Sequence, residues 1–325
     1  MRALVLGVNG QDGSYLAEEL LRAGYTVVGA GRQPESRYVR PDSSFVYIEA
    51  DLENAEAVGC LLREARPDAI YHMAAVHGPA GFNYEETAAA ALCVNTVLVQ
   101  QLLEHLRLAQ KPVSLTCAGS AKQFGARLPE TVDEASPRRA DCLYSISKNT
   151  ANDLLRYYRE KHNVRAGMIY YWNHESPRRS PEYFIPVLLE ALTCAVRGEK
   201  RKTRFRSLDF WCDWGSAEEY MHLTRLVAEK APEQDVIMAS GRTVYGGWLA
   251  ETLFSMFGRC WRDFLDCQDT PRDVGVLPPW RVNNGALRAI VGTVPLVRIE
   301  ELCLNILDNK GIRPFRSSTP STRRE

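Results

Sequence analysis

A glycine-rich loop near the start of the chain constrains the fold more than any other feature. The apolar run Ala3–Leu6 precedes this loop, and the amphipathic pattern Ser14–Ala23 follows it. A strand, a tight glycine turn and a helix in this order bring backbone close to a pyrophosphate at the helix N-terminus. The loop therefore predicts that the chain binds a dinucleotide. Its candidate cofactor-binding residues are Gly7, Gly10, Gln11, Asp12 and Gly13.

Short apolar runs alternate with helical patterns through the first half of the chain. The expected strands are Ala3–Leu6, Thr26–Ala30, Phe45–Ile48, Ala69–Met73, Val113–Cys117 and Ala166–Tyr171. The expected helices are Ser14–Ala23, Ala55–Ala65, Ala88–Leu108 and Tyr144–His162. This alternation predicts an α/β fold, with a doubly wound parallel Rossmann sheet covered by helices on both faces.

The pattern loosens in the second half, where several prolines and fewer strands occur. We expect a dinucleotide-binding domain over 1–172, to which 209–245 return. A smaller, mostly helical C-terminal substrate domain is expected over 173–208 and 246–312. The segment 313–325 is rich in Ser, Thr and Arg, a composition that predicts a disordered tail.

The composition gives no reason to expect nucleic acid or a membrane as a partner. Lys plus Arg number 40 and Asp plus Glu number 40, so the formal net charge is zero. No apolar stretch is expected to approach the ~20 residues that span a bilayer, and no signal-peptide pattern opens the chain. The 9 cysteines are scattered without a C-x-x-C pair, which fits reduced thiols and no metal site. We therefore expect a cytoplasmic protein.

The residues after the second and third expected strands bear on the choice of cofactor. An acid at the end of the second strand would bind the ribose 2′-hydroxyl of NAD, whereas an arginine accepts the 2′-phosphate of NADP. Arg32 stands here, with Arg37 and Arg40 close behind. NADP is therefore favoured and NAD is possible; the alternative is that Arg32 only meets solvent. Asp51 and Leu52, after the third strand, are placed to meet the adenine.

A tyrosine and a lysine lie one helical turn apart at Tyr144 and Lys148, on one helix face. Free tyrosine has a pKa near 10, so acid–base work near neutral pH needs a shift of roughly 3 units, or about 4 kcal/mol. The Lys148 ammonium and an oxidised nicotinamide can supply that positive potential. Tyr144 would then take a hydroxyl proton while carbon gives hydride to the nicotinamide. Ser120, after the fifth strand, would hydrogen-bond the same oxygen; an exposed helix pair is the alternative.

Longer motifs also stand out along the chain. They are Gly10–Glu18, Tyr71–Ala75, Asn173–Arg179, and Asp213–Gly215 followed by Glu219 and Tyr220. Together they resemble the extended short-chain dehydrogenase/reductases (the NAD-dependent epimerase/dehydratases), and within them the GDP-mannose 4,6-dehydratases. The resemblance implies a nucleoside-diphosphate hexose as substrate, with Asn173 near the diphosphate or sugar. It also implies that Ala74 and Ala75 contact the cofactor, and that the chain forms a homodimer or homotetramer.

One position departs from this resemblance in a way that changes the chemistry. Dehydration in the family needs a carboxylate two residues after the active-site Ser or Thr, and this chain has Lys122 there. An ammonium cannot abstract a proton, and a neutral lysine needs burial that lowers its pKa by several units. The substrate side also departs, at Ile185–Val187, Cys212 and Pro271–Val274. His77 is a further candidate to contact the substrate, with a packed or solvated histidine as the alternative.

Three functions are compatible with these residues. The leading hypothesis is an enzyme that keeps hydride transfer at hexose C4 and has lost C5 deprotonation. It would be a nucleotide-sugar 4-oxidase, 4-keto-sugar reductase or 4-epimerase, with a GDP-sugar favoured, and would need only Ser120, Tyr144 and Lys148. The second is a true 4,6-dehydratase in which Lys122 or a displaced carboxylate is the base. The third is a cofactor-bound regulator without turnover, against which the intact tyrosine–lysine pair argues.

Overall fold

A seven-stranded parallel sheet organises the larger part of the protein. The computed structural model describes residues 1–79, 81–269 and 278–314. The sheet strands are β1 (Arg2–Leu6), β2 (Thr26–Gly31), β3 (Phe45–Glu49), β4 (Ala69–His72), β5 (Ser114–Ser120), β7 (Arg165–Tyr171) and β11 (Val236–Met238). They lie in the order β11-β7-β5-β4-β1-β2-β3. The strand order reverses at β1, so ligands of such a sheet bind at the carboxyl ends of β1 and its neighbours.

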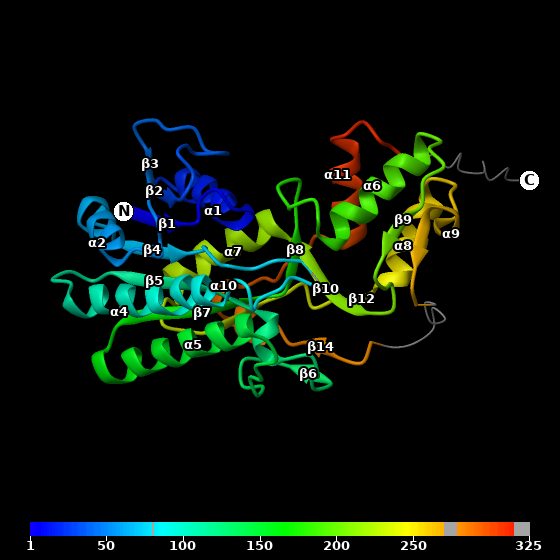
Figure 1. Ribbon diagram of the computed structural model, residues 1–325. Coiled ribbons are helices and arrows are strands. Elements are labelled where there is room, and N and C mark those ends of the chain that lie inside the picture. The colour runs from blue at the N-terminus through cyan, green and yellow to red at the C-terminus, as the bar shows by residue number, and fades with distance from the viewer. Residues whose placement is uncertain (80, 270–277, 315–325) are drawn as a thin grey trace, which may run out of the picture. The chain divides into compact units, whose positions relative to one another are not determined.

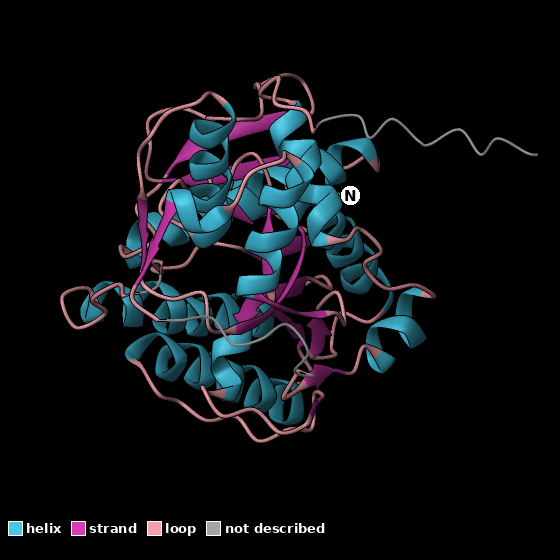
Figure 2. Ribbon diagram, turned by 90° about the vertical axis from the view of Figure 1, so that its right-hand side faces the viewer, coloured by secondary structure: helices cyan, strands magenta, loops and turns pink. Residues whose placement is uncertain are grey.

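Helices cover both faces of this sheet, because alternate residues of each strand are apolar and need burial on both sides. Along β1, Leu4 and Leu6 join one core and Ala3 and Val5 join the other. The first core is closed by α2 (Ala55–Ala65), α4 (Leu98–Leu108) and α5 (Leu143–His162). The second is closed by α1 (Gln11–Arg22), α7 (Ala217–Lys230) and α10 (Gly285–Val291). Figure 1 labels these elements, and Figure 2 shows the magenta strands running between cyan helices. The predicted doubly wound fold is confirmed.

The helical run 88–108 differs from the uninterrupted helix that the sequence predicted. It consists of α3 (Ala88–Leu92), a π-helical turn η1 (Cys93–Val97) and α4. By length and composition alone this run could cross a membrane, so the expectation that no apolar stretch approaches that length is wrong. Its apolar residues have partners inside the protein, since Leu98, Leu102 and Leu106 pack in the first core. Core helices pass the same length test.

The chain divides into two compact units. The sheet unit comprises Met1–Arg179, Asp213–Thr243 and Pro279–Arg298, and the helical unit comprises the described residues of Ser180–Cys212, Val244–Pro278 and Ile299–Glu325. The expected ranges placed 173–179 and 279–298 with the substrate domain, whereas here they belong to the sheet unit. Pairing explains both returns, because β8 (Asn173–Glu175) pairs with β10 (Trp211–Ser216) and β14 (Arg281–Val282) pairs with β6 (Thr131–Val132).

The helical unit is built mainly from helices around a small two-stranded sheet. Its helices are α6 (Phe184–Val196), α8 (Gly246–Met256), α9 (Trp261–Phe264) and α11 (Ile299–Asp308). Strands β9 (Thr203–Phe205) and β13 (Leu265–Cys267) pair in parallel. Two further short elements are η2 (Ala121–Phe124), which follows β5 in the sheet unit, and β12 (Thr243–Tyr245). Of the predicted tail 313–325, residues 315–325 lie outside the described residues, and so does the motif position Pro271–Val274.

Candidate active site

The glycine loop predicted to bind the cofactor connects β1 to α1 at the carboxyl edge of the sheet. Gly7 has a φ of +84°, and a Cβ on it would lie 2.7 Å from the backbone of Ala74. A Cβ on Gly13 would lie 2.2 Å from the carbonyl oxygen of Gly7. Side chains are therefore excluded at both positions. Their absence lets α1 pack closely on the loop at Gly13 and lets Ala74, just beyond β4, approach the loop at Gly7.

This loop fits the phosphates of a dinucleotide cofactor. The cradle exists only because Gly7 and Gly13 lack side chains, and α1 is a 12-residue helix whose N-cap, Gly10, adds no side-chain cap. First-turn N–H groups of such a helix, with the positive end of its dipole, bind anionic phosphate oxygens. A bound nucleotide would thus rest on the N-terminus of α1 and on the residues after β4.

The segment Asn173–Arg179 packs onto this loop, which sequence analysis did not anticipate. His174 Nε2 lies 2.8 Å from Asp12 Oδ1, and the hydroxyl of Ser176 donates to Gln11 Oε1 at 2.8 Å. Gln11 Nε2 in turn donates to the His174 carbonyl oxygen at 3.3 Å. Asn173, the expected sugar contact, is exposed on β8. Gln11 and Asp12 therefore hold β8 against the loop.

Asp12, His174 and Glu175 form a group of neighbouring charges at this contact. Burial opposes the charge on Asp12, but the charge and hydrogen bond of His174 hold the pKa of Asp12 at about 2. Asp12 likewise raises the pKa of His174 against the effect of burial. Burial raises the pKa of Glu175 to about 7, although Arg179 and His174 oppose the rise. Glu175 is thus a carboxyl group that titrates near neutral pH.

Arg178, from the same segment, ties α1 to the chain that follows β2. Its guanidinium lies 4.0 Å from the ring centroid of Tyr15 and 4.8 Å from that of Tyr38. It donates to the Ser14 hydroxyl at 2.9 Å and to the Glu18 carboxylate at 2.6 Å. Cation–π stacking and charge-assisted hydrogen bonds act together here, so this arginine braces the first turns of α1.

The loop after β2 carries Arg32, the residue expected to choose the cofactor. Arg32 is exposed at the strand end. The surrounding loop is ordered by Asn9, whose side chain donates to the Glu35 carbonyl oxygen at 2.8 Å and accepts from the Arg37 amide at 2.8 Å. Tyr47 donates to the Gln33 carbonyl oxygen at 2.6 Å. An exposed guanidinium on an ordered loop at this edge fits a phosphate group.

The two residues expected to meet the adenine follow β3. Asp51 is exposed, and its side chain accepts from the Glu53 amide at 3.0 Å, which fixes the turn into α2. Leu52 is partly buried against the first core. Ala75, beside Ala74, is exposed. These residues line the same carboxyl edge of the sheet as the glycine loop, because their strands are parallel neighbours.

Tyr144 and Lys148 lie in the first two turns of α5, both buried. The Lys148 ammonium donates to the Ala118 carbonyl oxygen at 2.7 Å and lies 5.9 Å from the ring centroid of Tyr144. Ala118 is on β5, two residues before Ser120. Burial lowers the pKa of Lys148 to about 8, so the side chain is still mostly cationic at neutral pH. The structure thus brings the expected tyrosine and lysine to the strand end that carries the serine.

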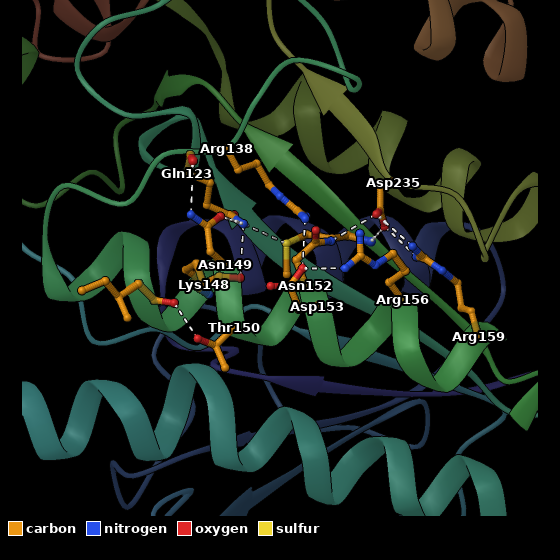
Figure 3. Close-up of polar contacts among 12 residues, drawn as sticks. Gln123, Arg138, Lys148, Asn149, Thr150, Asn152, Asp153, Arg156, Arg159 and Asp235 are labelled. Atoms are coloured by element: carbon orange, nitrogen blue, oxygen red, sulfur yellow. Dashed lines mark hydrogen bonds and ion pairs between the residues drawn. The ribbon is translucent and has the colours of Figure 1, made fainter. Parts of the chain in front are cut away.

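Polar contacts along α5 fix the position of this lysine (Figure 3). Gln123 donates to the backbone carbonyl oxygen of Lys148 at 3.2 Å. At the other end of the helix, Asp235 accepts from Arg159 at 2.7 and 2.9 Å and from Asn152 at 3.1 Å. The helix is therefore anchored both to the turn after β5 and to the chain that enters β11.

Asn95, on the π turn, is a structural contributor that the sequence did not reveal. It is fully buried, donates to the Ser147 hydroxyl at 3.1 Å and accepts from the Val76 amide at 3.3 Å. Thr96 adds a bond from its hydroxyl to the Ser147 carbonyl oxygen at 2.9 Å. Short π-helical turns often mark functional sites, and this one joins α5 to the segment after β4. A lone asparagine in an apolar helix was the available signal.

His77 lies beside Tyr144, and Lys122 lies beside Tyr84, which itself stacks on Tyr144. Lys122 is exposed on η2, and its ammonium donates to the Tyr84 hydroxyl at 3.3 Å. The Tyr84 ring stacks on Tyr144 with centroids 5.7 Å apart, and the His77 ring meets Tyr144 edge-on at 4.9 Å. Burial lowers the pKa of His77 to about 3, with a further contribution from Lys122. His77 is therefore a neutral imidazole.

Within the described ranges, no cluster of three or more His, Cys, Asp or Glu could bind a metal ion.

Comparison with known proteins identifies the family of this chain. The sequence profile of the GDP-mannose 4,6 dehydratase family matches residues 4–273. The chain belongs to this family. It is 29% identical over 254 residues to a GDP-mannose 4,6-dehydratase of Vibrio cholerae, covering 74% of this chain and 68% of the relative. It is 27% identical over 328 residues to GDP-mannose 4,6 dehydratase 2 of Arabidopsis thaliana, covering 94% and 86%.

Solved structures share the fold. UDP-glucose 4-epimerase of Thermus thermophilus, in complex with NAD, superposes with a TM-score of 0.78 at 21% identity, over 98% of this chain and all of that one. The protein RMD of Pseudomonas aeruginosa, complexed with NADPH, gives 0.75 at 18% identity, over 95% and 99%. The family assignment and this fold confirm the predicted class, an enzyme of the nucleotide-sugar epimerase and dehydratase type on a short-chain dehydrogenase/reductase fold.

The structure bears on Lys122, the residue that replaces the carboxylate expected for dehydration in the GDP-mannose 4,6 dehydratase family. The sequence left open a neutral, buried lysine as the base for dehydration. Lys122 is exposed instead, so the burial that this role requires is absent. The departure at Ile185–Val187 lies in α6 of the helical unit, where Ile185 is part of the buried interior. That stretch therefore contributes packing.

Proposed function

We propose that this member of the family transfers hydride at C4 of a nucleotide-activated hexose without removing water. It would act as a 4-oxidase, a 4-keto-sugar reductase or a 4-epimerase. The observation that carries the proposal is the contrast between two lysines, Lys148 next to Tyr144 and Lys122 next to Tyr84. Lys148 is buried and mostly cationic at the position that assists proton transfer. Lys122 stands where dehydration in the family needs a carboxylate, and it is exposed, without the burial that a neutral lysine base requires.

The chemistry of the chain's own residues follows from their contacts. Ser120 and Tyr144 would both contact the C4 oxygen of the sugar. With the Lys148 ammonium 5.9 Å from its ring centroid, Tyr144 can exist as tyrosinate and accept the hydroxyl proton during oxidation. During reduction it would return that proton. A bound nicotinamide would supply the hydride acceptor or donor at C4.

We favour NADP as the cofactor, with NAD possible. Arg32 is an exposed cation directly after β2, where a 2′-phosphate would lie, and no acidic side chain occupies the strand end. The proposed cofactor contacts are the glycine loop with Gln11 and Asp12, Arg32, Asp51, Leu52, Ala74, Ala75, Tyr144 and Lys148. Guanidinium groups bind phosphate through charge-assisted hydrogen bonds.

The substrate side of the proposal rests on relatives and on nearby side chains. Because the named relatives are GDP-mannose dehydratases, we favour a GDP-sugar, with His77 and Asn173 as contacts.

The scattered cysteines fit a reducing, cytoplasmic setting.

We also propose a homodimer or homotetramer formed through the long helices of the sheet unit. The observation behind it is a set of large apolar side chains exposed on η1, α4 and α5. They are Val97, Leu108, Ile146 and Tyr157. Exposed apolar groups on neighbouring helices are typical of subunit interfaces. Light scattering on the purified chain measures the assembly, and a monomer at micromolar concentration contradicts this part.

The test is a product assay on the purified protein with its bound cofactor identified. Incubation with a panel of GDP- and UDP-hexoses should give a 4-epimer or a stoichiometric change in cofactor oxidation state, with no loss of water by mass spectrometry. Tyr144→Phe should abolish this turnover, whereas Tyr25→Phe, which removes a hydroxyl just before β2, should leave it unchanged. A product lighter by one water with no net cofactor change would establish the dehydratase instead. Silence across the panel with cofactor bound would point to a regulator.

A further inference from the structure

The ammonium of Lys122 has unused hydrogen-bonding capacity at the edge of the site. It donates one bond, to Tyr84, and it lies 5.2 Å from the centroid of that ring. An ammonium has three N–H donors, so two remain. Lys122 makes no ion pair with any residue in the parts of the chain that the structure describes. An exposed cation that no carboxylate among the described residues neutralises is available to a ligand.

Tyr84 supplies a second donor next to this ammonium. Its hydroxyl oxygen accepts from Lys122, which leaves its own hydrogen to donate. The ring is buried, and it stacks on Tyr144 with an interplanar angle of 23°. The Lys122 ammonium and the Tyr84 hydroxyl are therefore separated from Tyr144, the residue proposed to contact the sugar C4 oxygen, by the Tyr84 ring alone. Paired donors at this spacing match the two oxygens of a carboxylate.

The local charge balance favours an anion at this place. Beside burial, the charges of Lys122, Arg179 and Lys148 lower the pKa of His77, and Asp12 opposes them. Asp12 is itself paired with His174. Of the three cations, Lys148 is bonded to a backbone carbonyl and Arg179 lies 3.7 Å from Glu175. Lys122 is the cation left to meet the part of the substrate that lies beside Tyr144.

We propose that Lys122 and Tyr84 bind a carboxylate on the sugar, so that the substrate is a nucleoside-diphosphate hexuronate. This inference rests on the proposed function, since that function places sugar C4 at Tyr144. In a hexose ring, C4 is bonded to C5, and C5 carries C6, the carbon that is oxidised to a carboxylate in a hexuronate. The carbon of a 6-carboxylate therefore lies two bonds from the reacting carbon. This places the carboxylate within reach of Tyr84, which stacks on Tyr144, and of Lys122 next to it. A 6-hydroxymethyl group could accept a hydrogen bond from the ammonium but carries no charge to pair with it.

The experiment compares matched pairs of substrates on the protein with its cofactor bound. The pairs are GDP-mannuronate with GDP-mannose, and UDP-glucuronate with UDP-glucose. The quantities measured are kcat/KM for each and the dissociation constant by calorimetry. The wild type should prefer the hexuronate of at least one pair by about 10- to 100-fold, the scale of one charge-assisted hydrogen bond. In Lys122→Gln this preference should fall at least tenfold, and rising salt should weaken it in the wild type.

Two further variants control the comparison. Tyr84→Phe keeps the stacked ring and removes the hydroxyl, so it should lose part of the preference. Lys161→Gln makes the same charge change at an exposed position in the last turn of α5 and should leave the preference unchanged. A wild type that treats both members of each pair equally, or a preference that survives in Lys122→Gln, overturns the inference.

The outcomes separate this inference from the proposed function. Turnover of hexoses without a hexuronate preference refutes the carboxylate site and leaves C4 hydride transfer standing. Hexuronate binding that weakens in Lys122→Gln, without turnover of any sugar, supports the site and refutes the proposed chemistry. Absence of both turnover and a binding difference refutes both. Because Lys122 is exposed, its variant should fold, and retained cofactor binding checks that it does.

Discussion

Replacing Lys148 by methionine tests the electrostatic account of the active site most directly. The lysine ammonium lies 5.9 Å from the ring centroid of Tyr144. With the tyrosinate charge placed at the ring centroid, two unit charges at this separation, in an effective dielectric of about 20, interact by about 3 kcal/mol, or about 2 pH units. Loss of the cation destabilises the tyrosinate by that amount. The acidic limb of the kcat/KM profile should therefore move up by about 2 pH units, and the rate at pH 7 should fall about 100-fold.

Two variants frame that measurement. Lys148→Arg keeps a cation and should leave the acidic limb within about half a pH unit of its wild-type position, even if geometry lowers the plateau. Tyr144→Phe should remove the limb together with activity. The methionine variant also leaves the Ala118 carbonyl without its donor, so bound cofactor and circular dichroism must be compared first. An acidic limb that stays in place in folded Lys148→Met refutes the reasoning.

Three other expectations follow from single positions. Gly13→Ala should abolish cofactor binding, because the new methyl meets backbone at 2.2 Å, whereas Gly59→Ala in α2 should bind cofactor as the wild type does; fluorescence titration of both decides. Arg32→Ala should weaken NADP relative to NAD by about 10- to 100-fold in the same titration, and an unchanged ratio contradicts the assignment. Burial lowers the pKa of His72 to about 3, so the unfolded chain takes up its proton first, near pH 6.5, and stability falls from that pH downward. His72→Gln should flatten this fall in urea unfolding at several pH values, and an identical pH dependence would show that other groups cause it.

The sheet was predictable because its signals are local. Each buried parallel strand is a short apolar run, and each crossover helix has its own periodicity, so the alternation could be recognised without knowing any contact. The i and i+4 spacing of Tyr144 and Lys148 is equally local, and the structure adds only what the lysine contacts. The π turn at Cys93–Val97 was missed because it changes neither composition nor periodicity enough to be seen.

Contacts between distant segments could not be read from spacing. The pairing of Asp12 with His174 joins residues 162 positions apart, and the sequence offered only a resemblance for the second of them. Lys122 shows the same limit for electrostatics. Its residue type was evident, but whether it is buried and neutral or exposed and charged depends on tertiary packing. The return of 279–298 to the sheet unit likewise depends on β14 pairing with β6.

The long-range closure of the glycine loop bears on how the enzyme is made. The loop is synthesised well before the segment that braces it, because Gln11 bonds to a residue 163 positions later. At ~5–20 residues per second, the partners of the loop arrive roughly 10 to 30 s after it. A nascent chain that ends before Asn173 thus has the phosphate cradle but lacks the segment that braces it. We therefore expect the nucleotide to bind late in biosynthesis, after Asn173–Arg179 has been made.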